Sequence, residues 1–323
     1  MQRDVVISLR VILFYDTPLP IDNYSTHCKT IHHHLSITVL PISHPAPKMA
    51  PAPRILLLGG HGKVSLHITP KILSRSWNLI SVVRNPDHKQ DILNAAEKAP
   101  KEGRGNVEVL VESIENVKSE GDAKSILERV KADWVVWCAG AGGKGGKERT
   151  YAIDQNACIH FIRASISTPS ISKFLLLSAL LSRRSRAPWW SDEDWKYIQK
   201  VNTEILPDYY KAKLAADQAL VVLGSERRDW TWIDLRPGTL SDDEETGKIS
   251  LGKTNGQANV TRGDVAEVAV RLLGKEGLKS GYFDLLNGDD EIGAAVDKVV
   301  TEGVDARDGE EFEDLKGSEF LKL

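Results

Sequence analysis

The sequence predicts a doubly wound α/β fold, in which a mostly parallel sheet carries helices on both faces. Short apolar runs without polar alternation recur along the chain, as expected of parallel strands that are covered on both sides. Stretches of helix length separate these runs, and the first run, at 54–58, leads directly into a glycine-rich turn. Because the 323 residues continue this one pattern, we expect one main domain at 52–303 that includes a small C-terminal lobe.

Six apolar runs are predicted to form the strands of this sheet. They occupy residues 54–58, 79–83, 107–111, 133–140, 174–177 and 231–235. The stretch at 123–130 is predicted to be helical, and 264–273 repeats apolar residues at helical spacing and is expected to close the fold. The acidic residues from Asp305 to Glu313 predict a solvated C-terminal tail at 304–323.

The composition is that of an ordinary globular protein. With 41% hydrophobic and 27% charged residues and a net charge of -3, nothing indicates a nucleic-acid or membrane-surface partner. Cys28, Cys138 and Cys158 have neither disulfide nor metal-pair spacing, which is typical of a reducing compartment. No apolar run reaches the roughly 20 residues that cross a bilayer. We therefore expect a cytoplasmic monomer or homodimer with a small-molecule partner, no metal, and no binding to nucleic acid or membrane.

Residues 1–51 differ in composition from the rest of the chain. The first 53 residues hold seven of the 14 prolines and five of the nine histidines, with few charged residues. This composition predicts either a disordered extension or a native start at Met49. A mitochondrial presequence is the alternative, although three acidic residues among few arginines disfavour it. The adjacent residues His32, His33 and His34 point in different directions, so they do not predict a metal site.

The turn after the first apolar run has the residues of a phosphate-binding loop. Gly59, Gly60 and Gly62 allow a tight reversal and bring bare backbone close to a pyrophosphate. The helix predicted to follow has free N–H groups that attract anions. An ordinary turn is the alternative, but a second strand after a helix-length gap favours a dinucleotide site. The residues predicted to bind the cofactor here are Gly59, Gly60, His61, Gly62, Lys63 and Val64.

Arg84 directly follows the second run, at the position where an acidic residue normally selects NAD(H) by bonding the ribose 2′-hydroxyl. An arginine at this position favours a 2′-phosphate, through charge-assisted hydrogen bonds from its guanidinium. A solvated loop charge is the alternative interpretation. The sequence therefore predicts NADP(H) rather than NAD(H) as the cofactor.

The ends of the later runs point to the same crevice, because ligands of open α/β sheets bind at the carboxyl edge. Ala139 and Gly140 end the fourth run in small residues, which let a ribose and nicotinamide lie against backbone. A flexible connection is the alternative. Ser178 directly follows the fifth run. The sixth run is followed by Pro237, Gly238 and Thr239.

Tyr209 and Lys213 are predicted to lie one turn apart on one face of a helix. An ammonium beside a phenol favours the phenolate, and so we expect Lys213 to lower the pKa of Tyr209 toward neutrality. Such a tyrosine passes a proton to a substrate oxygen during hydride transfer. Two surface residues of an amphipathic helix are the alternative.

Together these motifs resemble the short-chain dehydrogenase/reductase superfamily, and more narrowly its atypical branch. The segments at 59–64, 139–146 and 261–266 are similar to biliverdin reductase B-like and NmrA-like proteins. The likeness covers about residues 52–290 and implies a Rossmann-like NAD(P)-binding domain whose small C-terminal lobe binds the substrate.

The resemblance also implies a role for each matched residue. Tyr209 would be the acid/base, Lys213 would hold the nicotinamide ribose, and Ser178 would orient the substrate oxygen. Arg84 would hold the 2′-phosphate. The chain departs from the family pattern in one respect, because the stretch between Ser178 and Tyr209 is longer than in the usual arrangement. Atypical members of the superfamily often lack a working tyrosine.

The function expected from this resemblance is an NADPH-dependent reductase of a small carbonyl or conjugated molecule. A non-catalytic NADP-sensing regulator of the NmrA-like kind is one alternative, and a nucleotide-sugar epimerase or dehydratase is another. Trp189 and Trp190 lie in the longer stretch. They form either an aromatic wall over the substrate or part of the core.

Overall fold

The computed structural model describes residues 51–142 and 145–323, which belong to one compact unit. The predicted extension at 1–51, with the possible start at Met49 and the three adjacent histidines, therefore lies outside the described residues apart from Pro51. Among the described residues, no helix has the length and apolarity that a bilayer crossing requires.

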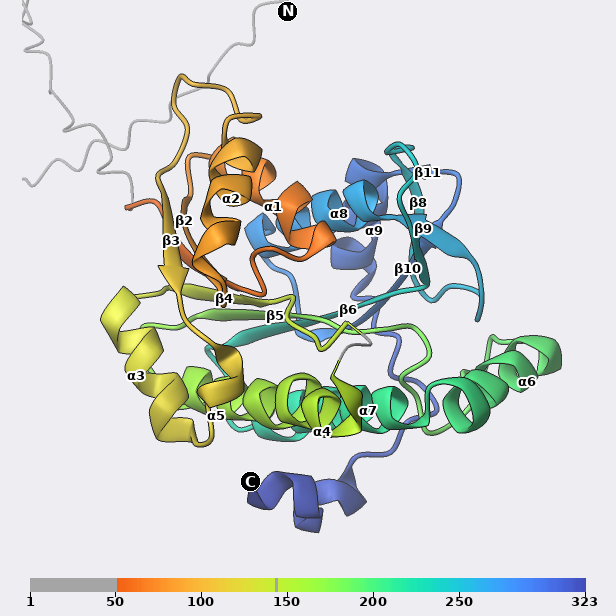
Figure 1. The fold of residues 1–323 in the computed structure, drawn as a ribbon. Helices are drawn as coiled ribbons and strands as arrows, with labels where there is room; N and C mark the ends of the chain where they lie inside the picture. The colour runs from red at the N-terminus through yellow and green to blue at the C-terminus, as the bar shows by residue number, and fades with distance from the viewer. Residues whose placement is uncertain (1–50, 143–144) are drawn as a thin grey trace, which may run out of the picture. The chain divides into compact units, whose positions relative to one another are not determined.

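The main sheet runs through the middle of the described unit (Figure 1). Its strands are β1 (Arg54–Leu58), β2 (Asn78–Val83), β3 (Val107–Val111), β4 (Trp134–Trp137), β5 (Lys173–Leu177), β6 (Thr231–Pro237), β8 (Lys248–Gly252), β10 (Gly281–Asn287) and β11 (Asp290–Glu291). They lie in the order β11-β8-β10-β6-β5-β4-β1-β2-β3. Pairing is parallel from β3 across to β10, and antiparallel where β8 joins β10 and β11 joins β8. The predicted doubly wound sheet is confirmed.

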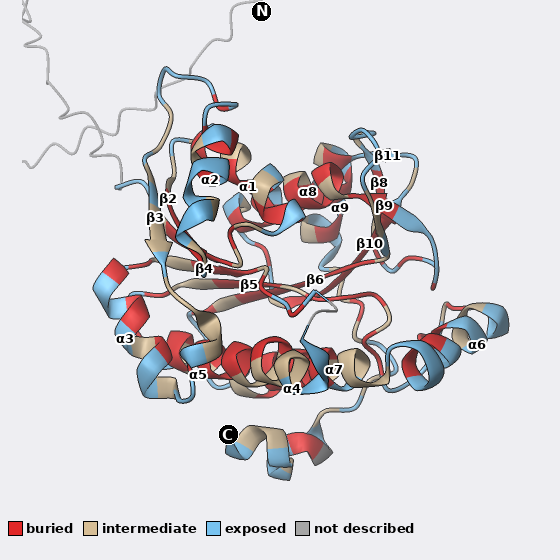
Figure 2. Cartoon of the chain, viewed as in Figure 1, coloured by how far each residue is buried: buried red, intermediate tan, exposed pale blue. Residues whose placement is uncertain are grey.

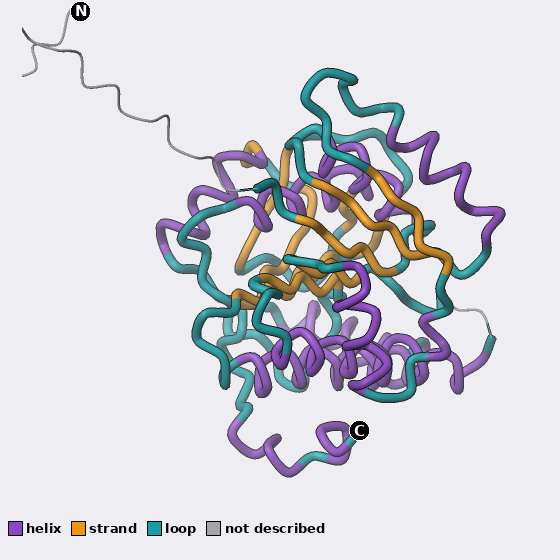
Figure 3. The backbone as a smooth tube through the Cα atoms, turned by 90° about the vertical axis from the view of Figure 1, so that its left-hand side faces the viewer, coloured by secondary structure: helices purple, strands orange, loops and turns teal. Residues whose placement is uncertain are grey.

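Helices cover both faces of this sheet. Their bounds are α1 (Lys63–Leu73), α2 (Lys89–Ala96), α3 (Glu120–Val130), α4 (Gly146–Thr150), α5 (Cys158–Ser167), α6 (Asp192–Lys200), α7 (Pro207–Gly224), α8 (Arg262–Gly274) and α9 (Ile292–Glu302). In Figure 1, α1, α2, α8 and α9 lie above the sheet, and α3, α4, α5 and α7 lie below it. The view turned by 90° shows the same strand layer between helices (Figure 3).

Short segments complete the fold. A separate parallel pair is formed by β7 (Thr239–Ser241) and β9 (Asn259–Thr261). Two π-helical segments, η3 (Tyr151–Ala157) and η4 (Val201–Ile205), extend α4 and α6. The 3-10 turns are η1 (Pro86–His88), η2 (Ile114–Asn116), η5 (Glu313–Gly317) and η6 (Glu319–Lys322).

Strand β1 explains why the sheet needs helices on both faces. Ile55 and Leu57 pack into the core under α1 and α8, while Leu56 and Leu58 pack into the core over α5 and α7. All four side chains are fully buried. An apolar residue is therefore needed at every position of the strand, which is why the run shows no alternation. Figure 2 shows the resulting buried surface on the strands and on the facing sides of the helices.

All six predicted strands are present, with small differences at their ends. Strand β4 is shorter than the predicted run at 133–140, because Cys138 to Gly140 leave the sheet to line a cavity. Strands β8, β10 and β11 were not predicted. Strand β10 contains the buried Asp284 within an apolar stretch, and β11 has only two residues.

The structure also decides between the interpretations of the tryptophan pair. Trp190 is 2% exposed, and the indole N–H groups of Trp189 and Trp190 both donate to the carbonyl of Thr254, at 2.8 and 2.9 Å. Neither ring lines the main cavity. The core interpretation therefore holds in place of the aromatic wall.

The expectation that the acidic tail is a solvated end is wrong for its first part. Ala306 is fully buried. The guanidinium of Arg183 donates to the carbonyls of Ala306 and Asp308, both at 2.5 Å. The carboxylate of Glu310 accepts from the backbone N–H of Ser185 at 2.7 Å. These backbone contacts pack residues 306–310 onto the loop after β5.

Candidate functional site

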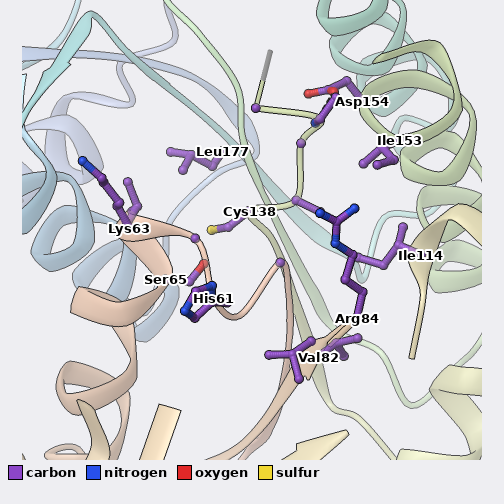
Figure 4. A pocket seen from close by; sticks show the side chains of 18 of the residues that line it. His61, Lys63, Ser65, Val82, Arg84, Ile114, Cys138, Ile153, Asp154 and Leu177 are labelled. Carbon is purple, nitrogen blue, oxygen red and sulfur yellow. Dashed lines mark hydrogen bonds between the residues drawn. The ribbon is translucent and has the colours of Figure 1, made fainter. Parts of the chain in front are cut away.

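A cavity of about 670 Å³ opens at the carboxyl edge of the parallel strands. The loops that follow β1, β2, β3, β4 and β5 all contribute to its lining, and α7 supplies one wall. Figure 4 shows side chains from the ends of these strands and from the loops after them around the cavity. Of the residues predicted from the sequence, those lining the cavity are Gly59, His61, Gly62, Lys63, Val64, Arg84, Ala139, Gly140, Ser178, Tyr209 and Lys213.

The glycine loop is held against the next strands by its bare backbone. Gly59 has a φ of 82°, and a Cβ atom there would lie 2.6 Å from the Cα of Ala139. Gly60 donates its N–H to the carbonyl of Val82 at 2.8 Å. Gly62 caps α1 without a side-chain hydrogen bond, and no acidic residue occupies the first turn of that helix. The helix N-terminus at the cavity is therefore suited to an anion.

The two polar side chains of the loop lie on different flanks. The ring of His61 stacks on His88 with centroids 3.6 Å apart, and its Nε2 lies 2.8 Å from the carboxylate of Asp91. Lys63 instead donates to Asp242 at 2.5 Å, beyond the other side of the loop. Figure 4 shows the side chain of His61 next to Ser65 and that of Lys63 pointing away from both.

Arg84 extends from the end of β2 into the cavity (Figure 4). Its guanidinium donates to Oε1 of Glu115 at 3.0 Å, and Nε of Arg149 donates to the same oxygen at 2.8 Å. The hydrogen bond from Arg149, and then that from Arg84, holds the pKa of the Glu115 carboxyl below its ordinary value. Glu115 is therefore an anion at neutral pH that bridges two arginines.

The small residues after β4 lie directly against a buried carboxylate. Asp154, from the π-helical segment η3, accepts the N–H of Ala141 at 2.8 Å. A Cβ atom on Gly140 would lie 2.8 Å from Oδ1 of Asp154, so a larger residue there would displace this carboxylate. Burial raises the pKa of Asp154 despite the nearby ammonium of Lys213. Asp154 was not predicted from the sequence, because a single acid in a helical stretch carries no motif.

Tyr209 and Lys213 share one face of α7, as predicted, and both line the cavity. Lys213 is 3% exposed and donates its Nζ to the carbonyl of Leu177 at 2.8 Å. Burial alone would lower the pKa of this ammonium. The neighbouring Tyr209, Asp154 and Asp217 have the opposite and larger effect, so the pKa of Lys213 is raised.

The expectation that Lys213 brings the pKa of Tyr209 toward neutrality is wrong for this structure. Burial raises the pKa of the phenol above its ordinary value, and the carboxylates of Asp154 and Asp217 act in the same direction. The ammonium of Lys213 lowers the pKa of Tyr209, but its effect is smaller than that of burial. Tyr209 therefore stays protonated at neutral pH, which is the form that can donate a proton.

Ser178 lines the cavity at the end of β5, but its hydroxyl already has a partner. The Oγ atom lies 2.6 and 2.8 Å from the two carboxylate oxygens of Asp217, to which it donates. Burial raises the pKa of Asp217, although Arg236 and Lys213 oppose this effect. The hydroxyl oxygen of Ser178 keeps lone pairs that can accept a hydrogen bond from a ligand.

Four residues predicted to bind the cofactor are not part of the cavity lining: Gly60, Pro237, Gly238 and Thr239. A Cβ atom on Gly60 would lie 2.0 Å from Oγ of Ser81, so Gly60 packs against β2. Pro237 is still paired with β10, and Thr239 is paired with β9. Between them, a Cβ atom on Gly238 would lie 2.4 Å from the carbonyl oxygen of Ala258. Sheet pairing and packing occupy this segment, and Leu240 lines the cavity instead.

Many lining residues were not predicted from the sequence. They are Val82, Val83, His88, Glu112, Ser113, Ile114, Glu115, Cys138, Arg149, Ile153, Asp154, Leu177, Leu240 and Arg262. Several of them immediately precede or follow predicted strand ends, which is the signal that could have found them. Asp154, Arg149 and Arg262 come from helical segments, and no sequence spacing connects them to the cavity.

Comparison with known proteins agrees with this geometry. Residues 59–276 match the family described as NAD(P)H-binding. The chain is 31% identical to the UPF0659 protein C216.03 of Schizosaccharomyces pombe, over 77% of this chain and 95% of that protein. It is 27% identical to the uncharacterized sugar epimerase YhfK of Bacillus subtilis, over 76% of this chain and all of that protein.

Solved structures with the same fold include proteins described as epimerases and as reductases. A Bacillus halodurans protein named as an NAD-dependent epimerase/dehydratase superposes with a TM-score of 0.60 and 25% identity, covering 78% of this chain and 100% of that chain. The anaerobilin reductase ChuY of Escherichia coli O157:H7 superposes with a TM-score of 0.53 and 18% identity, covering 73% and 98%, which shows the fold alone. The chain has a Rossmann-like domain and belongs to the NAD(P)H-binding family.

Proposed function

We propose that this protein is an NADP(H)-dependent reductase of the atypical short-chain dehydrogenase/reductase type, acting in the cytoplasm on a small carbonyl or conjugated molecule. One observation carries the proposal: Tyr209, Lys213 and Ser178 line the same cavity as the glycine loop. The cofactor would supply the hydride. The protein residues would bind the cofactor and transfer a proton to the substrate oxygen.

The residues of the cavity fit a phosphorylated dinucleotide. The backbone at Gly59 passes so close to Ala139 that no side chain fits between them, and the N-terminus of α1 carries no acidic side chain in its first turn. The cationic side chains of Arg84 and Arg149 lie further along the same cavity. Backbone N–H groups would bind the diphosphate, and Arg84 would bind the 2′-phosphate.

The other end of the cavity supports proton transfer to a substrate oxygen. Tyr209 lines the cavity with a hydroxyl that is protonated at neutral pH, and this hydroxyl would donate its proton as the hydride arrives. Lys213 is held by the carbonyl of Leu177 and keeps two further N–H donors for a ribose. Ser178 donates its one hydroxyl hydrogen to Asp217 in this structure and would turn that hydrogen to the substrate oxygen in order to orient it.

Replacing Tyr209 with Phe tests this mechanism. Because the phenol is the proposed proton donor, we expect Tyr209→Phe to lower NADPH-dependent turnover by about 100-fold or more while leaving the Kd for NADPH nearly unchanged. Turnover is measured as loss of reduced-cofactor absorbance across a panel of carbonyl acceptors, and Kd by calorimetry. Tyr210→Phe is the matched control, since its hydroxyl donates to the carbonyl of Arg183 and does not line the cavity.

Three outcomes would change the proposal. Unchanged turnover in Tyr209→Phe would remove this residue from the mechanism. Tight NADPH binding without oxidation by any acceptor would favour the non-catalytic regulator. The third outcome is conversion of a nucleotide sugar with no net consumption of NADPH. It would favour the second candidate function, a nucleotide-sugar epimerase or dehydratase, which the names of two similar proteins suggest.

A further inference from the structure

One carboxylate in the cavity holds two arginines through a single oxygen atom. Oε1 of Glu115 accepts from Arg84 at 3.0 Å and from Arg149 at 2.8 Å. A second nitrogen of Arg149 donates to the carbonyl of Ala141 at 2.9 Å. All four residues line the cavity. This Arg84–Glu115–Arg149 bridge therefore connects the loops that follow β2, β3 and β4.

The two arginines of the bridge differ in how firmly they are held. The side chain of Arg149 is 18% exposed and also holds Ala141, whereas that of Arg84 is 55% exposed. The Glu115 side chain is 37% exposed and is ionised at neutral pH, because both guanidinium groups lower its pKa. An anion that approaches Arg84 thus meets a guanidinium that is already paired with an internal carboxylate.

We propose that Glu115 is a specificity-determining residue, an internal counterion that the ribose 2′-phosphate of NADP(H) must displace from Arg84. This inference rests on the proposed NADP(H) function. Arg84 would exchange the carboxylate for the phosphate, while Arg149 would keep Glu115 in place. NAD(H) carries no 2′-phosphate and requires no exchange. Glu115 consequently weakens the preference for NADP(H) that Arg84 creates.

Replacing Glu115 with Gln removes the competing charge with almost no change in shape. We expect the Kd of Glu115→Gln to fall about two- to fivefold for NADPH and for 2′,5′-ADP, because the competing ion pair is partly exposed and correspondingly weak. The Kd for NADH and 5′-AMP should change less than about twofold. The gain for NADPH should shrink as NaCl is raised, since salt screens the competing carboxylate.

Glu112→Gln is the matched control for this experiment. Glu112 lines the same cavity three residues earlier, but its carboxylate accepts from Arg129 at 2.8 Å and not from Arg84. Neutralising it should leave the ratio of the two Kd values, for NADPH and NADH, unchanged. Thermal melting of each variant shows that its fold is intact.

Different results would overturn the inference. Weaker NADH binding with unchanged NADPH binding would make Glu115 a ligand of the ribose hydroxyl. If the Kd values of all four probes fell equally, or if Glu112→Gln had the same effect, Glu115 would act only through its general negative charge and not through Arg84. If wild-type protein binds none of the four probes, the proposed function itself fails and the inference with it. Wild-type binding of NADPH without a gain in Glu115→Gln sinks the inference alone.

Discussion

Ser178 and Lys213 each face the cavity while holding a partner inside the protein. Ser178 donates to Asp217, and Lys213 donates to the carbonyl of Leu177. Such contacts fix the rotamer of a side chain before a ligand arrives, which limits the ordering that binding requires. The cavity therefore presents polar groups whose directions the protein has already set.

Gly59 is the residue at which backbone geometry limits the site most strictly. Gly59→Ala places a Cβ atom 2.6 Å from the backbone of Ala139 at a φ of 82°. We expect it to lower the free energy of unfolding by more than about 2 kcal/mol, from left-handed strain together with the clash. We also expect weaker NADPH binding, because the clash displaces the loop. Chemical denaturation and calorimetry measure the two effects.

Gly277→Ala is the control for the strain component of that prediction. Gly277 has a φ of 74°, but a Cβ atom added there would have nothing within 4 Å of it. It should therefore lose only about 1 kcal/mol, with NADPH binding unchanged. Equal losses in the two variants would mean that the contact with Ala139 has no energetic importance.

The first turn of helix α8 is capped by a side chain and also holds a neighbouring loop. The side chain of Thr261 accepts the N–H of Asp264 at 3.0 Å and so caps the helix. The fully buried carboxylate of Asp264 in turn accepts from the N–H groups of Thr246 and Gly247, at 2.9 and 3.0 Å. The start of α8 therefore fixes the loop that precedes β8.

Asp264→Asn should expose this anchoring in the pH dependence of stability. Burial alone would raise the pKa of Asp264, but the hydrogen bonds from Thr246 and Gly247 outweigh it and lower the pKa. A lowered folded-state pKa means that the ionised carboxylate stabilises the protein above about pH 4, and that this stability is lost as pH falls through the folded-state value. We expect Asp264→Asn to cost about 1–3 kcal/mol at pH 7.

Denaturation at pH 7 and at pH 3 checks this prediction. The difference in the free energy of unfolding between Asp264→Asn and wild type should be smaller at pH 3, because the wild-type carboxyl begins to be neutralised by a proton at that pH. Asp192→Asn is the control, because its side chain is 82% exposed and should change stability by less than about 0.5 kcal/mol. If the loss of unfolding free energy in Asp264→Asn grew as the pH fell, the stabilising role of the ionised Asp264 carboxylate would be contradicted.

At the scale of the whole molecule, a charged cluster lies inside the fold behind the cavity. Arg236 and Asp284 are both fully buried on neighbouring strands, with Nε and Oδ1 3.5 Å apart. Asp217, which holds Ser178, is fully buried as well. Burial raises the pKa of Asp284 to about 6 even though Arg236 opposes it. The cavity wall is thus backed by buried charges, which are costly to leave unpaired.

Binding of the cofactor should stabilise the described unit as a whole, since the cavity takes residues from five strand ends and from α7. At about 100 times its Kd, NADPH should add about 2.7 kcal/mol to the free energy of unfolding. For a unit of this size that corresponds to a rise in Tm of about 5–10 °C. A thermal scan with GTP at the same concentration is the control. No shift with NADPH, or an equal one with GTP, would count against a specific dinucleotide site.

The candidate site could be predicted from the sequence only where a local pattern carried the information. The turn at Gly59 to Val64 and the pair Tyr209 and Lys213 have fixed spacings, and all of these except Gly60 line the cavity. Pro237, Gly238 and Thr239 follow the predicted run at 231–235, yet Pro237 is paired with β10 and Thr239 with β9, and none of the three lines the cavity. Which residues after a strand face a ligand depends on the path of the loop, and spacing does not encode that path.

Strands β1 to β6 could be predicted from the amino-acid order, because a parallel strand covered on both faces needs an unbroken apolar run, and such runs are visible without any tertiary information. The partners and the ionisation of the polar groups, in contrast, followed from the packing of the folded chain. Arg84 meets Glu115 across 31 residues, and Ser178 meets Asp217 across 39. The pKa of Tyr209 rises because burial outweighs Lys213. Burial and long-range charge contacts exist only after the chain has packed, which is why the predicted direction of that shift was wrong.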